Sequence, residues 1–320
     1  MMISHKTLGI DISKKTFDVA LLCNEKLKNK KFTNDSQGFE LLRQWLDKHD
    51  GLKAHICLEA TGVYGEPLSE YLYALGCLTS VVNPARVKGF AQSELLRHKT
   101  DKADAGLIAR FCHAMRPLPW TPMPKETRLL RDLVRHLEAL QGMRQQKRNR
   151  LEAASEIIKV QLLRHIDYLD IEIKENKSLI NQHIESHPAL DERKRLLASI
   201  PGIGEATIRV ILAELGDINQ FKNAKALSAF IGVAPRVRES GSSLRGRGLM
   251  SKTGRSQLRK AFFMPALVAL RYNPAIKKMK VRLTEAGKSK MTIVGAAMRK
   301  LVHLIYGVLK NGVPFDEKLA

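Results

Sequence analysis

Residues 127–185 contain no proline and only one glycine, Gly142. Apolar residues recur through this stretch in steps of three and four, a spacing that predicts long helices with a coiled-coil-like seam. The polar segment MRQQKRNR at 143–150 interrupts the spacing, so a bend or a nucleic-acid contact is expected there. Two interpretations are equally open: a helical hairpin that packs on itself, and a coiled coil that joins two chains.

The stretch RPLPWTPMP at 116–124 precedes these helices, and its four prolines are typical of a domain boundary. A chain of 320 residues also exceeds one small domain. We therefore expect three domains, over residues 1–120, 121–190 and 191–320.

Before the boundary, short apolar runs rich in β-branched residues alternate with segments of helical spacing. The predicted order β-β-β-α-β-α-β-α indicates an α/β domain in which helices flank a mixed sheet. The expected strands are 7–12, 16–22, 25–33, 54–58 and 76–82, and the expected helices are 36–48 with Ser36 as N-cap, 66–75 and 101–115.

Acidic residues occur where these elements begin or end. Asp11 lies in the first strand, although aspartate is depleted in strands, and Glu59 follows the fourth. Asp101 and Asp104 open the last helix at a spacing that places both on one side. Each has an ordinary explanation as a helix cap or a surface residue, but together they predict a site. Asp18, in the second strand, is expected in solvent.

Carboxylates that share a small volume raise one another's pKa unless cations compensate them. Two divalent metal ions about 4 Å apart would compensate them and would serve phosphoryl transfer. Oxygen ligands favour Mg²⁺, with Mn²⁺ as a substitute. We therefore predict a metal site on Asp11, Glu59, Asp101 and Asp104.

The formal net charge is +22, and residues 191–320 alone carry 25 basic and nine acidic residues. Such a concentrated positive field attracts a polyanion, and nucleic acid is favoured over a ribosomal-type or heparin-like surface. This region is expected to be mainly helical, over residues 195–221, 226–232, 256–271 and 291–310.

The segment IPGIG at 200–204 lies between two apolar helical stretches and resembles a helix-hairpin-helix turn. Gly202 and Gly204 would let backbone N–H groups approach a DNA phosphate, whereas the alternative is an ordinary turn between helices. Residues 234–260 are basic and rich in glycine and serine, so a flexible loop that closes on a phosphodiester is expected. The candidate nucleic-acid-binding residues are Gly202, Gly204, Arg236, Arg238, Arg245, Arg247, Lys252, Arg255 and Arg259.

A serine in this loop would usually cap a turn or bind phosphate, but neighbouring cations could also activate it as a nucleophile. Composition does not choose among Ser240, Ser242 and Ser243. The four cysteines are widely spaced and form no C-x-x-C pair, which is typical of reduced thiols in a cytoplasmic protein. No apolar stretch is long enough to predict a membrane span.

Five short motifs, spread over nearly the whole chain, match those of a known protein family in their order and spacing. They are GIDISK at 9–14, EATG at 59–62, HKTDKADA at 98–105, IPGIG at 200–204, and the run from PRVRESG at 235–241 to SKTGRSQLR at 251–259. In these motifs the sequence resembles the DEDD transposases of bacterial insertion sequences, the IS110 family, which includes the Piv-type DNA invertases.

The resemblance implies a RuvC-like, RNase H-type domain, a coiled-coil middle, and a C-terminal domain that carries the nucleophile. It places the metal-binding tetrad on Asp11, Glu59, Asp101 and Asp104, and the nucleophile on Ser240. It further implies that the serine attacks a DNA phosphate and holds it covalently while a partner subunit's metal site completes the centre. A homo-oligomer follows, a dimer at minimum or a tetramer that holds two duplexes, and a bridge RNA pairs with target and donor DNA.

Two other functions stay open on the sequence. One is a RuvC-like junction-resolving nuclease that uses the same tetrad with water as the nucleophile. The other is a non-catalytic nucleic-acid-binding protein that uses only the helix-hairpin-helix segment and the basic region.

Overall fold

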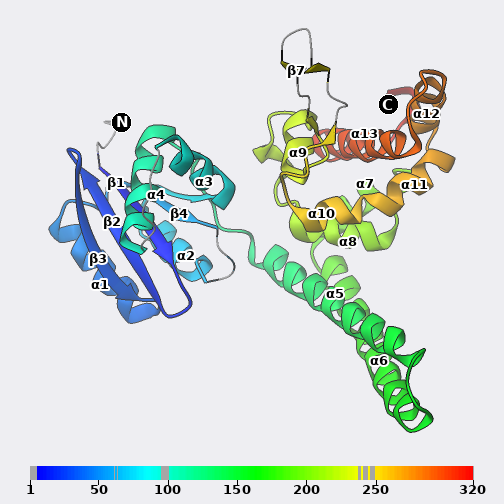
Figure 1. Cartoon of the computed structure of the whole chain (residues 1–320), viewed down its shortest axis with the longest axis horizontal. Coiled ribbons are helices and arrows are strands. Elements are labelled where there is room, and N and C mark those ends of the chain that lie inside the picture. Colours follow the sequence, from blue (N-terminus) through cyan, green and yellow to red (C-terminus); the bar gives the residue numbers. More distant parts are fainter. Residues whose placement is uncertain are drawn as a thin grey trace. The chain divides into compact units, whose positions relative to one another are not determined.

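The computed structural model describes residues 6–60, 62, 64–94, 101–236, 239–240, 244–245 and 249–319. The chain divides into two units, Met1–Pro122 and Met123–Ala320 (Figure 1). The helical segment at 121–190 belongs almost wholly to the second unit, together with the basic C-terminal region. The division into three domains stays a prediction.

The first unit is built on a five-stranded mixed sheet with the order β3-β2-β1-β4-β5 (Figure 1). An antiparallel meander forms one side, and two further strands continue parallel to β1, so the predicted mixed sheet is confirmed. The strands are β1 (Thr7–Ile12), β2 (Thr16–Cys23), β3 (Lys26–Thr33), β4 (His55–Glu59) and β5 (Thr79–Val82).

Helices cover both faces of this sheet. On one face, α1 (Ser36–Lys48) and α2 (Glu66–Ala74) share a core with Ile10 and Leu58. On the other face, α3 (Pro84–Ser93) and α4 (Asp101–Met115) form a second core. Burial on both sides explains why β1 and β4 are almost continuously apolar in sequence.

Two local features differ from the sequence prediction. The N-cap of α1 is Asp35, whose carboxylate accepts the Gly38 N–H at 2.8 Å, and not Ser36. Helix α3 was not predicted, because only Val87 among its residues is buried and its apolar periodicity is weak. Asn83 caps α3, and Pro84 occupies its first position, where a missing N–H costs nothing.

The second unit begins with a long hairpin of α5 (Lys125–Leu151) and α6 (Glu156–Glu185), which packs on itself. The predicted bend at 143–150 is wrong, since α5 continues unbroken through this segment. Arg144 bonds to the Asp170 carboxylate of α6, and Arg148 lies 3.6 Å from it. The basic segment therefore faces a carboxylate on α6 where an apolar seam would otherwise continue.

The rest of the second unit packs around α13, whose Ala297, Leu301 and Val302 are fully buried. By length and composition α13 could cross a membrane, but 50% of its apolar window is buried within the unit, as in a core helix. The region predicted as one helix over 256–271 is split at Phe262, and α12 was not predicted because only Ile276 of it is buried. These elements are α7 (Pro188–Ala198), α8 (Glu205–Glu214), α9 (Ala224–Ile231), α10 (Ser256–Ala261), α11 (Phe263–Tyr272), α12 (Pro274–Glu285), α13 (Lys290–Asn311), and the short strands β6 (Pro235–Arg236), β7 (Glu239–Ser240), β8 (Leu244–Arg245) and β9 (Leu249–Met250).

Candidate active site

The ends of β1 and β4 lie side by side, and each bears a carboxylate. The parallel register pairs Ile10 with Leu58, so Asp11 and Glu59 are the next residues along the two strands. Successive side chains of a strand alternate between the faces of the sheet. Because Ile10 and Leu58 face α1 and α2, Asp11 and Glu59 face the side covered by α3 and α4.

Helix α4 runs along this face of β1 in the opposite direction. The Thr7 hydroxyl donates to the Ala109 carbonyl at 2.9 Å. Two residues further on, a Cβ at Gly9 would lie 2.1 Å from the Ala105 carbonyl oxygen, so only glycine allows this approach. Two strand residues and four helix residues each advance about 6–7 Å, so the two elements keep this register.

One further step in the same register brings Asp11 to the first turn of α4, which carries Asp101 and Asp104. The segments that bear the four predicted carboxylates therefore converge at one end of the sheet. The Asp11, Glu59 and Asp104 side chains are half-buried, and the side chain of Asp101 lies outside the described residues.

The chemistry of this donor set fits a hard divalent cation, since carboxylate oxygens are the ligands that Mg²⁺ takes in proteins. Among the side chains that the structure describes, no three histidines, cysteines or carboxylates lie close enough together to hold an ion. The side chain of Asp101 is not among them.

A fifth carboxylate, Asp18, lies at the same end. The sequence prediction placed Asp18 in solvent, but it is only 8% exposed. It pairs with Asp11 across the β1–β2 ladder, so both face the same side, and its carboxylate lies 3.1 Å from the Lys31 amine on β3. The prediction was wrong because alternation along β2 places Asp18 on the face of the sheet opposite to Phe17 and Val19, but does not show that α4 covers the face that Asp18 is on.

The predicted nucleophile lies in a β-ribbon of the second unit. β6 pairs with β9 in one two-stranded sheet, and β7 pairs with β8 in another, which places Ser240 opposite Leu244; these two strand pairs together are called the ribbon. Of the predicted flexible loop, the described residues between 235 and 250 are therefore paired backbone, residues 251–255 have no regular structure, and α10 begins at Ser256. The side chains of Ser240 and Arg245 are not described, and four other predicted positions lie outside the described residues: Arg238, Ser242, Ser243 and Arg247.

The base of this ribbon is packed tightly against α9. Gly254 has a φ of 150°, and a Cβ there would lie 2.5 Å from the Phe230 carbonyl oxygen. The Arg255 N–H donates to the same carbonyl at 3.0 Å, and the Arg255 guanidinium lies over the Phe230 ring, 5.2 Å from its centroid. The structure thus gives Arg255, a predicted nucleic-acid-binding residue, a structural role at the ribbon base.

Glu214 of α8 joins this base to the helical hairpin. It is only 4% exposed, and its two carboxylate oxygens accept from Arg135 of α5 at 2.8 Å and from Arg255 at 2.9 Å. Burial, and to a smaller extent the negative charge of Glu214, raises the pKa of the nearby Glu138 carboxyl. One buried carboxylate therefore links α5, α8 and the chain that leaves the serine ribbon.

The predicted helix-hairpin-helix glycines have different surroundings. Gly202 has a φ of 102°, and a Cβ there would lie 2.8 Å from the Ala269 Cβ, so close packing on α11 explains this glycine. Gly204 is exposed at the N-terminus of α8. The following residue, Glu205, already places a negative charge in the first turn of that helix, where a phosphate would compete with it.

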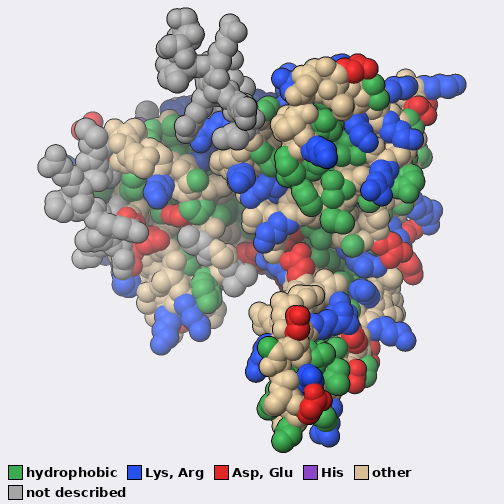
Figure 2. Space-filling model, turned by 45° about the vertical axis from the view of Figure 1, so that its right-hand side comes forward, with side chains coloured by type: hydrophobic (Ala, Val, Ile, Leu, Met, Phe, Trp, Pro, Cys, Tyr) green, Lys and Arg blue, Asp and Glu red, His purple; other side chains and the backbone are tan. Residues whose placement is uncertain are grey.

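Three other predicted basic residues lie near the ribbon base. Arg236 and Lys252 are exposed, and half-buried Arg259 donates to the Lys252 carbonyl at 2.9 Å. Figure 2 shows further lysine and arginine side chains scattered over the face of the molecule that it draws, with apolar side chains between them.

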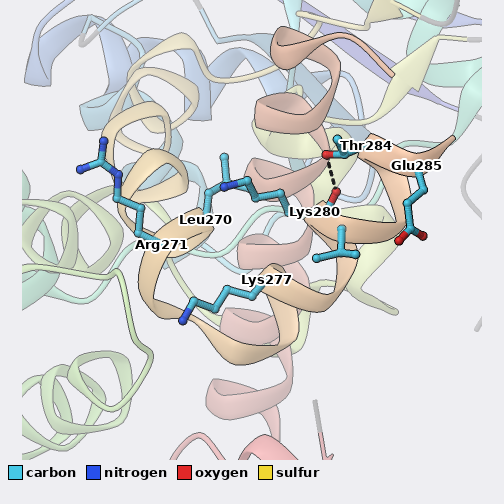
Figure 3. A pocket seen from close by; sticks show the side chains of 7 residues that line it. Leu270, Arg271, Lys277, Lys280, Thr284 and Glu285 are labelled. Carbon is cyan, nitrogen blue, oxygen red and sulfur yellow. Dashed lines mark hydrogen bonds between the residues drawn. The ribbon is translucent and has the colours of Figure 1, made fainter. Parts of the chain in front are cut away.

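A pocket of about 610 Å³ between α11 and α12 was not predicted (Figure 3). Its lining combines apolar side chains with three cations and one carboxylate, and Figure 3 shows that carboxylate, Glu285, at the end away from Arg271. The lining residues therefore carry a net positive charge. The lining residues are Leu270, Arg271, Lys277, Lys280, Val281, Thr284 and Glu285.

Comparison with known proteins gives matches over most of the chain. A family model described as a transposase of the IS116/IS110/IS902 family matches residues 194–280, and a DEDD-type transposase model of the IS110 group matches residues 8–158. The pilin gene-inverting proteins of Moraxella bovis and Moraxella lacunata are each 36% identical over 320 residues, which is 99% of this chain and 99% of each relative. The transposase of insertion sequence IS1328 from Yersinia enterocolitica is 28% identical over 162 residues, 49% of this chain and 46% of that protein.

Proposed function

Because the chain belongs to the IS110 family of transposases, enzymes that cleave and rejoin DNA, we propose that it is a DNA recombinase with a serine nucleophile and a magnesium site. The observation that carries the proposal is the convergence of Asp11 and Glu59 with the first turn of α4.

Asp11, Glu59, Asp101 and Asp104 would hold Mg²⁺ through carboxylate oxygens. Bound there, the metal would stabilise the negative charge that develops on a phosphate during strand cleavage. The pairing of Asp18 with Lys31 gives the negative charge of Asp18 a positive partner outside the tetrad.

In the cleavage step, the Ser240 hydroxyl oxygen forms a bond to a DNA phosphorus, and the bond from that phosphorus to one deoxyribose oxygen breaks. The serine proton ends on the departing deoxyribose hydroxyl. Attack by a hydroxyl of another strand reverses the step and regenerates the serine, so strands are exchanged without an external energy source. The pairing of Ser240 with Leu244 supports this role, since a nucleophile must be held in a reactive geometry.

We further propose a homo-oligomer, at least a dimer, in which the serine of one subunit acts beside the metal site of another. The outer surface of α6 supports association, because exposed apolar residues recur along it, and Figure 2 shows apolar side chains on the hairpin. These residues are Ile157, Val160, Tyr168, Ile171 and Leu179.

The basic residues of the second unit, including those of the α11–α12 pocket, would contact sugar–phosphate backbones, which position a nucleic acid but do not specify its sequence. Sequence choice would then come from a bridge RNA that pairs with both DNA partners, a division of labour that suits a chain with only 6% aromatic residues.

The test is capture of a covalent protein–DNA adduct after incubation with Mg²⁺ and DNA from the borders of the element. Ser240→Ala should form no adduct, whereas Ser242→Ala and Ser243→Ala should form it. Asp11→Asn should lose the adduct while it still binds DNA. Normal cleavage by Ser240→Ala would favour the junction-resolving nuclease, and DNA binding without cleavage under any condition would favour the non-catalytic protein.

A further inference from the structure

Asn34 connects three chain segments beside the proposed metal site. Its side-chain Nδ2 donates to the Ser13 carbonyl and to the Tyr64 carbonyl, each at 3.1 Å. Its backbone N–H donates to the Lys15 carbonyl at 2.9 Å. Asn34 thus bridges the β1–β2 turn, the β3–α1 connection and the loop between β4 and α2.

Two of these segments directly follow the strand-borne carboxylates. Ser13 lies two residues after Asp11, and Tyr64 lies five residues after Glu59. Within the described residues, the β1–β4 ladder has its last pair at Ile10 and Leu58. Asp11 still pairs with Asp18 of β2 and Glu59 with Val82 of β5, but no backbone pair joins Asp11 to Glu59 directly. Strand ends beyond a ladder can separate unless other contacts hold them.

Asn34 supplies such a contact, and Gly65 supplies a second. A Cβ at Gly65 would lie 3.3 Å from the Ile12 Cδ1, so the β4–α2 loop also packs against the end of β1. The Ser69 hydroxyl in turn donates to the Gly65 carbonyl at 2.8 Å, which fixes the loop to the start of α2.

The chemistry at Asn34 requires donors. Both partners of its side chain are backbone carbonyls, which only accept hydrogen bonds, so the group between them must offer two N–H or O–H hydrogens. A carboxamide has two, whereas a serine or threonine hydroxyl has one and an aliphatic side chain has none.

We propose that Asn34 is a positioning residue that sets the spacing of Asp11 and Glu59 and thereby the affinity of the site for a divalent cation. This inference rests on the proposed metal-dependent function. It assigns Asn34 no contact with metal or DNA; the residue acts only through the two loops.

The test is Mn²⁺ binding to the full-length protein, measured by electron paramagnetic resonance of the free ion. Asn34→Leu keeps the side-chain shape but removes both donors, and it should weaken Mn²⁺ binding about five- to tenfold. Asn34→Gln keeps both donors and should stay within about threefold of wild type. Asn29→Leu, at an exposed position of β3, is the matched control and should bind Mn²⁺ like wild type.

A purely structural role would lower the melting temperature of Asn34→Leu without changing its Mn²⁺ affinity, and that result would overturn the proposal. Equal losses of affinity in the Leu and Gln variants would overturn it as well, because the donors would then be irrelevant. In DNA cleavage, the Leu variant should need more Mg²⁺ for half-maximal rate but should approach the wild-type rate at saturation. Absence of Mn²⁺ binding by the wild-type protein would instead contradict the proposed metal site itself, which separates the two failures.

Discussion

Asp11 and Asp18 lie directly opposite each other in the β1–β2 ladder and face the same side of the sheet. The Cβ atoms of such a pair are about 5 Å apart, a separation at which like charges destabilise a sheet. Lys31 is the partner of Asp18 in the next ladder, and its amine lies 3.1 Å from the Asp18 carboxylate. The lysine on the edge strand therefore offsets part of the negative charge that gathers at this end of the sheet.

Replacing Lys31 should destabilise the first unit, because it removes the positive charge beside Asp18. In Lys31→Met the mostly buried Asp18 carboxylate loses its ion-pair partner, so we expect the free energy of unfolding to fall by about 1–2 kcal/mol. Added Mg²⁺ should restore more stability to the variant than to wild type, since a bound cation supplies the missing positive charge. Urea unfolding with and without Mg²⁺ measures both effects, with Lys28→Met on the same strand as control. Equal Mg²⁺ effects on Lys31→Met and wild type would contradict the prediction.

A methyl group at Gly9 should displace α4. In Gly9→Ala the new Cβ would lie 2.1 Å from the Ala105 carbonyl oxygen and 2.3 Å from the Ala109 nitrogen. Both are backbone atoms of α4, so they can move away only if the helix moves with them. Such overpacking costs about 1–3 kcal/mol or more, and it also moves the helix that carries Asp101 and Asp104. DNA cleavage should therefore fall further than thermal unfolding explains. Gly89→Ala in α3, where a Cβ meets no atom within 4 Å, should be neutral or stabilising.

The convergence of the acidic segments could be predicted because it depends only on the order of elements. Once β1 and β4 are parallel neighbours, Asp11 and Glu59 must reach the same edge of the sheet, whatever the side chains around them. The burial of Asp18 could not be predicted in the same way. It depends on which face α4 covers, and this is decided by the close contact at Gly9, between residues far apart in the sequence.

The glycines of the second unit show the same limit. The sequence indicates that Gly202 permits a close approach, but the approaching group is Ala269 of α11, a contact that only the tertiary structure reveals. Likewise, Arg255 was predicted among the residues that contact nucleic acid because of its charge and location. Its ion pair with the buried Glu214 depends on how α8 packs against the ribbon base.

The stability of the first unit should depend on pH through Glu40. The Arg43 side chain, together with the Tyr71 hydroxyl, lowers the pKa of Glu40 from 4.5 to about 2. The stabilisation from ionised Glu40 is therefore present above pH 4.5 and is lost as the pH falls toward 2. Glu40→Gln should melt below wild type at pH 7, and the difference should shrink as the pH falls from 4.5 toward 2. A difference in melting temperature that stays constant over this pH range would refute the assignment.

The apolar outer surface of α6 should control association. Tyr168 and Ile171 are 61% and 56% exposed on the isolated chain, so an interface there would bury substantial apolar area. Ile171→Glu should reduce the molar mass measured by light scattering after gel filtration, while the helical circular dichroism signal stays unchanged. If the mass of the variant equals that of wild type, the oligomer uses a different surface.

The basic lining of the α11–α12 pocket should determine part of the salt dependence of DNA binding. A protein that neutralises phosphates releases counterions, so the slope of log Kd against log salt changes by about one for each lost contact. If Lys277 and Lys280 each contact a phosphate, the double variant with glutamine at both positions should reduce the slope by about two. The loss of affinity should be the same for unrelated DNA sequences, because backbone contacts carry no sequence information. Lys88→Gln, at an exposed position of α3, serves as a single-charge control outside the pocket. An unchanged slope in the double variant would show that the pocket lies away from the nucleic-acid backbone, whereas a loss confined to one DNA sequence would indicate contact with bases.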